Sequence, residues 1–127
     1  VFAPTDRAFV ALARDLGYTG FDEEGSWNFL VGALTTLGGG DPIPVLTDVL
    51  TYHVLPKKVG LFPFLLATFT GEEFTTVQGA TIDPFLFWLE DQEPDLRDPR
   101  VTFPLNIQVA NGVIHSINRV LIPIDLP

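Results

Sequence analysis

The chain has 127 residues, 46% of them hydrophobic, which is the size of one globular domain with enough apolar side chains for a sizeable core. Its 16 acidic and 7 basic residues give a formal net charge of −9, which disfavours binding to nucleic acid phosphates and to anionic lipid headgroups. The absence of cysteine excludes disulfides and thiolate chemistry and leaves the redox compartment open.

Three segments in the first half of the chain show helical periodicity. The first begins after Thr5, which suits an N-cap, and ends at Gly17, which suits a C-cap. The second is predicted to begin at Ser26 and to end at Gly38, and the third has Pro44 in its first turn. The side chains expected to face the core are Phe9, Leu12, Ala13 and Leu16 in the first helix, Trp27, Leu30, Ala33, Leu34 and Leu37 in the second, and Val45, Leu46, Val49 and Leu50 in the third.

The second half of the chain is predicted to be rich in strands. We expect a short strand around Tyr52 to Leu55 and a short helical turn near Phe62 to Thr68. From residue 74 onward the pattern favours short strands, separated by turn residues such as Gly79 and Asp83-Pro84. The predicted strands cover residues 74–77, 80–82, 85–89, 100–103 and 105–110. Helices followed by a run of short strands indicate an α+β layer architecture.

The last segment has the clearest local pattern. Asn111-Gly112 runs directly into an apolar, β-branched stretch that ends at Pro123. Type I′ hairpin turns need positive φ at both central residues, which Asn and Gly tolerate, and a run of Val and Ile suits a buried pleated surface. The sequence therefore predicts a two-residue turn at Asn111-Gly112, followed by a central, buried strand.

Three motifs resemble those of the fasciclin-type (FAS1) domain family, in the family's order. Residues 1–9 resemble the first signature, residues 50–56 the Tyr-His element and residues 111–123 the second signature. The resemblance implies that residues 1–127 form one FAS1-type domain, a β-sandwich or wedge with helices packed against it. Because members usually have a helical stretch and a strand before the first signature, we expect upstream sequence to be missing.

The resemblance also implies a function in protein binding or adhesion without enzymatic activity. Partners would be proteins at a cell surface, in the matrix or in a membrane complex. The protein would be secreted or held at the cell surface, with the lumenal face of a membrane complex as the alternative. The family's Tyr-His element is linked to adhesion, which implies Tyr52 and His53 as binding residues. No apolar run approaches the roughly 20 residues of a membrane helix, so we expect no transmembrane span in this chain.

Some animal members of the family carry an integrin-recognised Asp-Ile element just before the Asn-Gly turn. This chain has Asn106-Ile107 at that place and therefore lacks the carboxylate that would meet an integrin metal site. The difference counts against integrin recognition.

Aromatic residues are concentrated in the middle of the chain, where seven of the 11 phenylalanines lie between Phe62 and Phe103. The runs 61–69 and 85–89 contain adjacent apolar residues, so neither a strand nor a helix can bury all of them on one face. Exposed aromatic side chains are typical of a surface that docks on another protein or on the boundary of a membrane. The alternative is that another layer of the protein covers them.

We predict that Phe62, Phe64, Phe87 and Trp88 contribute to such a binding surface. A permanent contact of this kind suggests an alternative function, in which the chain is an accessory structural subunit docked on a larger complex, whether or not that complex is embedded in a membrane.

A catalytic constellation is not evident, and we predict no enzymatic activity and no cofactor. Ser26 and Ser116 are the only serines, and neither lies in a Gly-x-Ser-x-Gly elbow. His53 and His115 could share a metal or a proton, but two histidines without a third ligand fall short of a zinc site. Each is predicted to be hydrogen-bonded within the domain. A small-ligand carrier or an enzyme with a pocket near the two histidines is the remaining alternative.

An acidic segment has part of a calcium-binding pattern. Asp91, Glu93 and Asp95 have the spacing that opens an EF-hand loop, but Leu96 stands where that loop requires glycine. We expect a solvated acidic loop, with weak surface binding of Ca²⁺ as the alternative, and no dedicated metal site.

Overall fold

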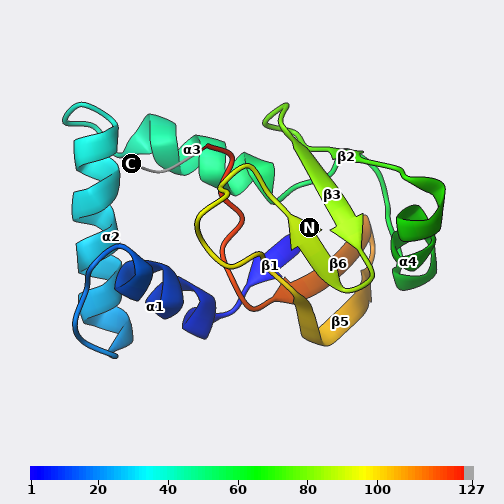
Figure 1. Cartoon of the computed structure of the whole chain (residues 1–127), viewed down its shortest axis with the longest axis horizontal. Coiled ribbons are helices and arrows are strands. Elements are labelled where there is room, and N and C mark those ends of the chain that lie inside the picture. The colour runs from blue at the N-terminus through cyan, green and yellow to red at the C-terminus, as the bar shows by residue number, and fades with distance from the viewer. Residues whose placement is uncertain (125–127) are drawn as a thin grey trace.

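The computed structural model describes residues 1–124, which contain four helices and two three-stranded sheets (Figure 1). Helices α1 (Asp6–Asp15), α2 (Glu23–Leu37) and α3 (Ile43–Tyr52) lie at one end of the molecule, whereas α4 (Leu61–Thr70) lies at the other. This mixed arrangement confirms the predicted α+β class.

The first sheet contains β1 (Phe2–Pro4), β6 (Gly112–Ile117) and β5 (Val101–Val109), in that spatial order. The central strand β6 is parallel to β1 and antiparallel to β5. Most of its side chains are buried, as the sequence of this β-branched segment predicts. The central and buried position of the last strand is therefore confirmed.

The turn before β6 differs from the prediction. Val109 pairs with Gly112, so the two residues of the loop are Ala110 and Asn111. Leu86 and Asn106 are the non-glycine residues with positive φ in the described chain, and Gly112 does not adopt positive φ. The hairpin is present, but the predicted type I′ turn at Asn111-Gly112 is wrong because strand pairing already includes Gly112.

The second sheet contains β2 (Phe74–Thr75), β3 (Thr81–Phe85) and β4 (Trp88–Glu90), all antiparallel to their neighbours. The predicted single strand 85–89 is wrong because Leu86 adopts a positive φ and turns the chain between β3 and β4. By contrast, the two strands predicted at 100–103 and 105–110 are parts of β5, whose register shifts between Thr102 and Ile107.

Several helix boundaries were predicted correctly and others were not. Thr5 caps α1, since its hydroxyl accepts a hydrogen bond from the Ala8 N–H. The predicted cap at Ser26 is wrong, because the Asp22 carboxylate accepts from the Gly25 N–H and starts α2 one turn earlier. The strand predicted around Tyr52 to Leu55 is also absent, because α3 continues to Tyr52.

The predicted inward faces of the helices are only partly correct, because Trp27 and Leu37 in α2 and Leu50 in α3 are exposed. Helix α4 is longer than the predicted turn and spans ten residues. The main core lies between the sheets and α4 and includes Phe2, Tyr52, Phe64, Phe74, Leu89 and Ile117. A smaller cluster of Ala8, Val120 and Ile122 joins α1 to the C-terminal segment.

Candidate binding surfaces

His53 is buried at the end of α3 and uses both ring nitrogens on the backbone. The Leu121 N–H donates to Nε2 at 2.9 Å, so the Nδ1–H donates to the carbonyl oxygen of Val49 at 2.6 Å. Burial lowers the pKa of His53 to about 4, which keeps the ring neutral at physiological pH. The prediction that His53 is hydrogen-bonded within the domain is confirmed.

His115 on β6 is held in the same way. Its Nδ1 accepts from the Asn106 N–H at 3.0 Å, and its Nε2–H donates to the carbonyl oxygen of Val59 at 2.9 Å. Burial lowers the pKa of His115. Because the backbone occupies both nitrogens of each ring, neither histidine offers a lone pair to a metal or a reacting group. Within residues 1–124, no cluster of three or more His, Cys, Asp or Glu side chains could hold a metal ion.

Tyr52, the other predicted member of the Tyr-His element, is also internal. Its side chain has no exposed surface, and its hydroxyl donates to the carbonyl oxygen of Thr81 at 2.7 Å. Burial raises the pKa of Tyr52 far above its usual value. Tyr52 and His53 thus connect α3 to the second sheet and to the C-terminal segment. A partner could touch either side chain directly only if the fold opened.

Asn106, which stands at the place of the Asp-Ile element of some animal members, fixes α4 to the first sheet. Its Oδ1 accepts from the Leu61 N–H at 3.0 Å, and its own N–H donates to His115. The N-cap of α4 is Gly60, which has no side chain to satisfy that N–H. Sequence reasoning missed this role, although a helix that begins after glycine indicates that an acceptor must come from elsewhere.

The carboxylates of the acidic segment after β4 accept hydrogen bonds from backbone N–H groups of the same loop and of the C-terminal segment. Asp91 accepts hydrogen bonds from the N–H groups of Glu93 and Ile122, at 3.1 and 2.9 Å, and Glu93 accepts from the Asp95 N–H at 2.6 Å. Burial raises the pKa of Asp91 to about 6. The prediction of a solvated loop is wrong for Glu93, whose side chain is buried.

Helix α4 presents apolar side chains on two faces. Phe64 and Ala67 point into the core, whereas Phe62, Leu66 and Phe69 are 72%, 44% and 78% exposed. The predicted exposure of Phe64 is wrong, because two residues along a helix rotate the side chain by about 200°. The exposed set repeats at the spacing of one helical face, which is a pattern that could have identified Leu66 and Phe69.

The β3–β4 hairpin continues this apolar region beside α4 (Figure 1). The Leu86 N–H donates to the Thr68 hydroxyl at 2.6 Å, which ties the hairpin's turn to the helix. Trp88 is 41% exposed, while Phe87 is half-buried against the core. We call the exposed set on both elements the aromatic surface; it comprises Phe62, Leu66, Phe69, Phe85, Leu86 and Trp88.

Carboxylates border the aromatic surface. On the exposed face of the hairpin, Phe85 pairs with Trp88, and Asp83 pairs with Glu90. Burial raises the pKa of Asp83, and repulsion from Glu73 and Glu90 adds to this effect. Among the described residues the one ion pair is Lys57–Glu72, so none of these three carboxylates forms an ion pair, and the guanidinium of Arg100 lies 5.9 Å from the centre of the Trp88 ring.

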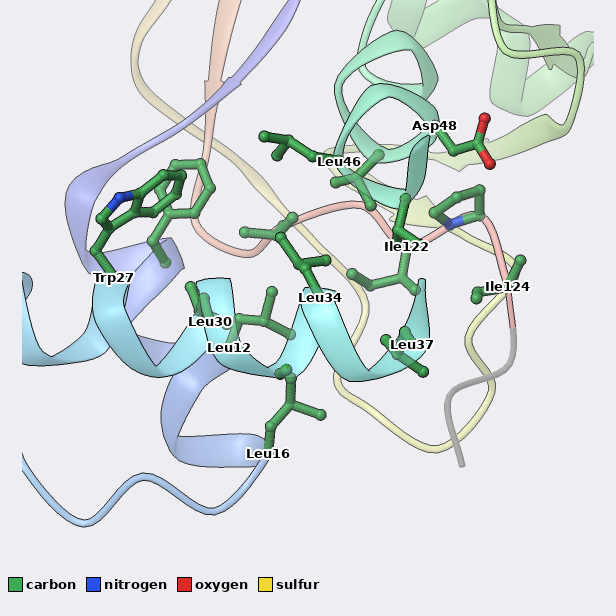
Figure 2. Close-up of a pocket in the computed structure, with 16 residues that line it drawn as sticks. Leu12, Leu16, Trp27, Leu30, Leu34, Leu37, Leu46, Asp48, Ile122 and Ile124 are labelled. Atoms are coloured by element: carbon green, nitrogen blue, oxygen red, sulfur yellow. The ribbon is translucent and has the colours of Figure 1, made fainter. Parts of the chain in front are cut away.

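At the other end of the molecule lies an apolar groove (Figure 2). We call this feature the helical groove; it runs between α1, α2, α3 and the C-terminal segment and encloses a cavity of about 100 Å³. Trp27, Leu30, Leu34 and Leu37 of α2 follow one wall, and among the described residues Asp48 is the one charged residue in the lining.

A family model of the fasciclin domain matches residues 1–123. The chain belongs to the fasciclin domain family. Comparisons with curated proteins and with solved structures find no significant match.

Fasciclin domains generally act in adhesion or protein interaction, are generally non-enzymatic, and typically occur in extracellular or surface-associated proteins. In this fasciclin domain, none of the helices within residues 1–124 has the length and apolar character needed to cross a bilayer. The motif residues that carry the family resemblance, Tyr52, His53 and His115, all lie inside the fold. The aromatic surface, by contrast, is exposed and differs from an ordinary polar exterior.

Proposed function

We propose that this fasciclin domain is a non-enzymatic binding module that docks on a protein partner through the aromatic surface. The observation that carries the proposal is the second apolar face of α4. This helix contains no charged residue and exposes Phe62, Leu66 and Phe69 although its opposite face already fills the core. A helix that is apolar on all sides is normally buried on all sides, so its outer face is suited to a contact.

The bordering charges favour a partner of particular chemistry. Asp83 and Glu90 lie opposite each other beside Phe85 and Trp88, and this like-charge pairing is unfavourable in the free domain. Lysine or arginine side chains on a partner would relieve the repulsion and would steer association. The partner is therefore a protein with an apolar patch edged by basic residues. Anionic lipid headgroups would meet the same carboxylates and be repelled.

The setting of this contact follows the family. A secreted or cell-surface protein that binds other proteins of the surface or matrix is the function we favour. An accessory subunit docked permanently on a larger complex, at the lumenal face of a membrane, would use the same surface. A carrier or an enzyme centred on the histidines finds no support, because the backbone occupies their ring nitrogens.

Two designed peptides test the proposal. Both form the same amphipathic helix with a leucine face, and one has lysines and the other glutamates at its edges. In a Trp27→Phe protein, Trp88 is the sole tryptophan and reports binding by its emission. We expect the lysine-edged peptide to bind, more weakly at high salt, and the glutamate-edged peptide to bind at least tenfold more weakly.

Matched variants locate the contact. Phe62→Ser combined with Phe69→Ser should weaken the lysine-edged peptide at least tenfold, because each buried aromatic side chain contributes roughly 1.5 to 3 kcal/mol. Phe21→Ser should have no effect, since Phe21 is a similarly exposed phenylalanine outside the aromatic surface. Equal affinity for both peptides, or equal effects of both substitutions, would exclude the proposed docking. Preferential binding to phosphatidylcholine vesicles would identify a lipid surface instead.

A further inference from the structure

A pocket with two carboxylates adjoins the helical groove at the end where α1 and α2 begin. The pocket and the groove share Phe9 and Trp27 in their linings, so the two cavities are adjacent. The pocket has a volume of about 190 Å³, and Asp6 and Glu23 complete its acidic side. We call it the acidic pocket.

The local sequence explains why these groups converge. Asp6 lies in the first turn of α1 and Glu23 in the first turn of α2, where carboxylates interact favourably with the helix dipoles. The rings of Phe9 and Trp27 meet edge to face, with centroids 6.4 Å apart. Two carboxylates beside a half-exposed tryptophan are groups that recognise an ammonium or guanidinium ion.

Ser26 supplies a separate observation. It belongs to the lining of the acidic pocket, its side chain is 1% exposed, and its hydroxyl has no hydrogen-bond partner in the described protein. A buried hydroxyl without a partner is unfavourable, and a donor from a ligand would satisfy it. The pocket thus contains an unused acceptor next to its two carboxylates.

The helical groove runs along most of α2. From Trp27 to Leu37 its wall follows α2 over about 15 Å, which corresponds to roughly three turns of an α-helix. Leu30 and Leu34 lie between these ends, and Figure 2 shows their side chains on the same wall. Asp48 adds a carboxylate to the opposite wall, on α3. The groove is therefore apolar along its length and negative at its margins.

We propose that the helical groove binds an amphipathic helix of a protein partner and that the acidic pocket receives an arginine or lysine of that helix. The apolar side chains of the helix fill the groove beside Leu30 and Leu34. The cation lies between Asp6 and Glu23, over Trp27, and donates a hydrogen bond to Ser26. This site is separate from the aromatic surface and does not depend on the function proposed for it.

The test uses a Trp88→Phe protein, in which Trp27 is the sole tryptophan and reports on the groove. The probes are two helical peptides of three to four turns with the same leucine face, one ending in arginine and the other in citrulline, its neutral isostere. We expect the arginine peptide to shift the Trp27 emission to shorter wavelength and to bind about fivefold more tightly than the citrulline peptide.

Substitutions assign the difference to the pocket. Asp6→Asn combined with Glu23→Gln should weaken the arginine peptide and bring its affinity close to that of the citrulline peptide. Ser26→Ala should weaken the arginine peptide. Glu24→Gln is the matched control, since this exposed neighbour does not line the pocket and should change neither affinity. The double substitution Phe62→Ser and Phe69→Ser should also leave both peptide affinities unchanged, even where it weakens binding at the aromatic surface.

Other outcomes would overturn the proposal. One is equal affinity for the two peptides, and another is a Trp27 emission that does not change when peptide is added. A third is that the pocket variants lose no more affinity for the arginine peptide than Glu24→Gln does. A Trp27 shift that grows with protein concentration in the absence of peptide would show that a second copy fills the groove. If another part of the same polypeptide covers Trp27, the groove is already filled, and binding of a separate protein partner there is likewise excluded.

Discussion

At the scale of single residues, the motif side chains act as bridges between backbone segments. His53 joins α3 to Leu121, and His115 joins β5 to Val59. Each ring needs one protonated and one unprotonated nitrogen to make its two hydrogen bonds. The neutral form is therefore part of the native structure.

His53 should titrate far below its ordinary range. Its folded pKa of about 4 lies below the unfolded value of 6.5, so its contribution to stability is complete above pH 6.5 and is lost as the pH falls towards 4. The shift corresponds to about 3 kcal/mol. Nuclear magnetic resonance titration of the imidazole nitrogens should show no protonation of His53 at pH 5.5. A pKa near 6.5 would contradict the bridging role.

The pH dependence of stability alone would not isolate His53. Asp91 has a pKa raised to about 6, so its contribution to stability falls as the pH rises, whereas that of His53 grows. The titration is therefore followed at His53 itself.

Asn106 should stabilise the start of α4. Asn106→Ala removes the acceptor for the Leu61 N–H and places alanine at a φ of 54°, so we expect a loss of about 1 to 2 kcal/mol in urea unfolding. Asn106→Asp keeps the acceptor and should lose less. If the alanine variant is as stable as the parent, the side chain does not cap the helix.

Gly112 should tolerate a side chain. It does not adopt positive φ, and an added Cβ would meet no atom within 4 Å. Gly112→Val should therefore change the free energy of unfolding by less than about 0.5 kcal/mol. A type I′ turn with Gly112 at its centre would instead make this substitution cost about 1 kcal/mol or more. Urea unfolding distinguishes the two values.

At the scale of elements, α4 differs from the other helices in having no polar face. Phe62 and Phe64 belong to the same helix but to opposite sides of it. We expect Phe64→Ala to cost about 3 to 5 kcal/mol, because it empties a core position, and Phe62→Ala to cost less than about 1 kcal/mol. Chemical unfolding of both variants tests this pair, and similar losses would mean that Phe62 is also part of the core.

The helices could be predicted from the sequence because their apolar spacing repeats over several turns. The start of α2 was predicted at the wrong residue, since Asp22 and Ser26 can both cap a helix and only the Asp22 carboxylate does so here. Strand β1 has three residues and pairs with β6 from the far end of the chain, so no local pattern marks it. The aromatic surface was predicted in part, because Phe62 and Trp88 are exposed but Phe64 is buried on the opposite face of α4 and Phe87 is half-buried.

At the scale of the whole molecule, two apolar features lie at opposite ends and both have acidic margins. The helical groove lies among α1, α2 and α3, and the aromatic surface lies on α4 and the second sheet (Figure 1). With a net charge of −9, copies of the domain repel one another, which opposes self-association through either feature. The groove could not be predicted from the sequence, because it forms only when the three helices and residues 120–124 come together.

The most direct test of the docking surface is hydroxyl-radical footprinting of phenylalanine side chains, with the lysine-edged peptide present and absent. The free domain should be oxidised at Phe62, Phe69 and Phe85, and the peptide should protect these three while Phe21 and Phe103, which are also exposed, remain reactive. Protection of Phe21 or Phe103 instead, or resistance of Phe62 and Phe69 to oxidation in the free domain, would contradict docking through the aromatic surface.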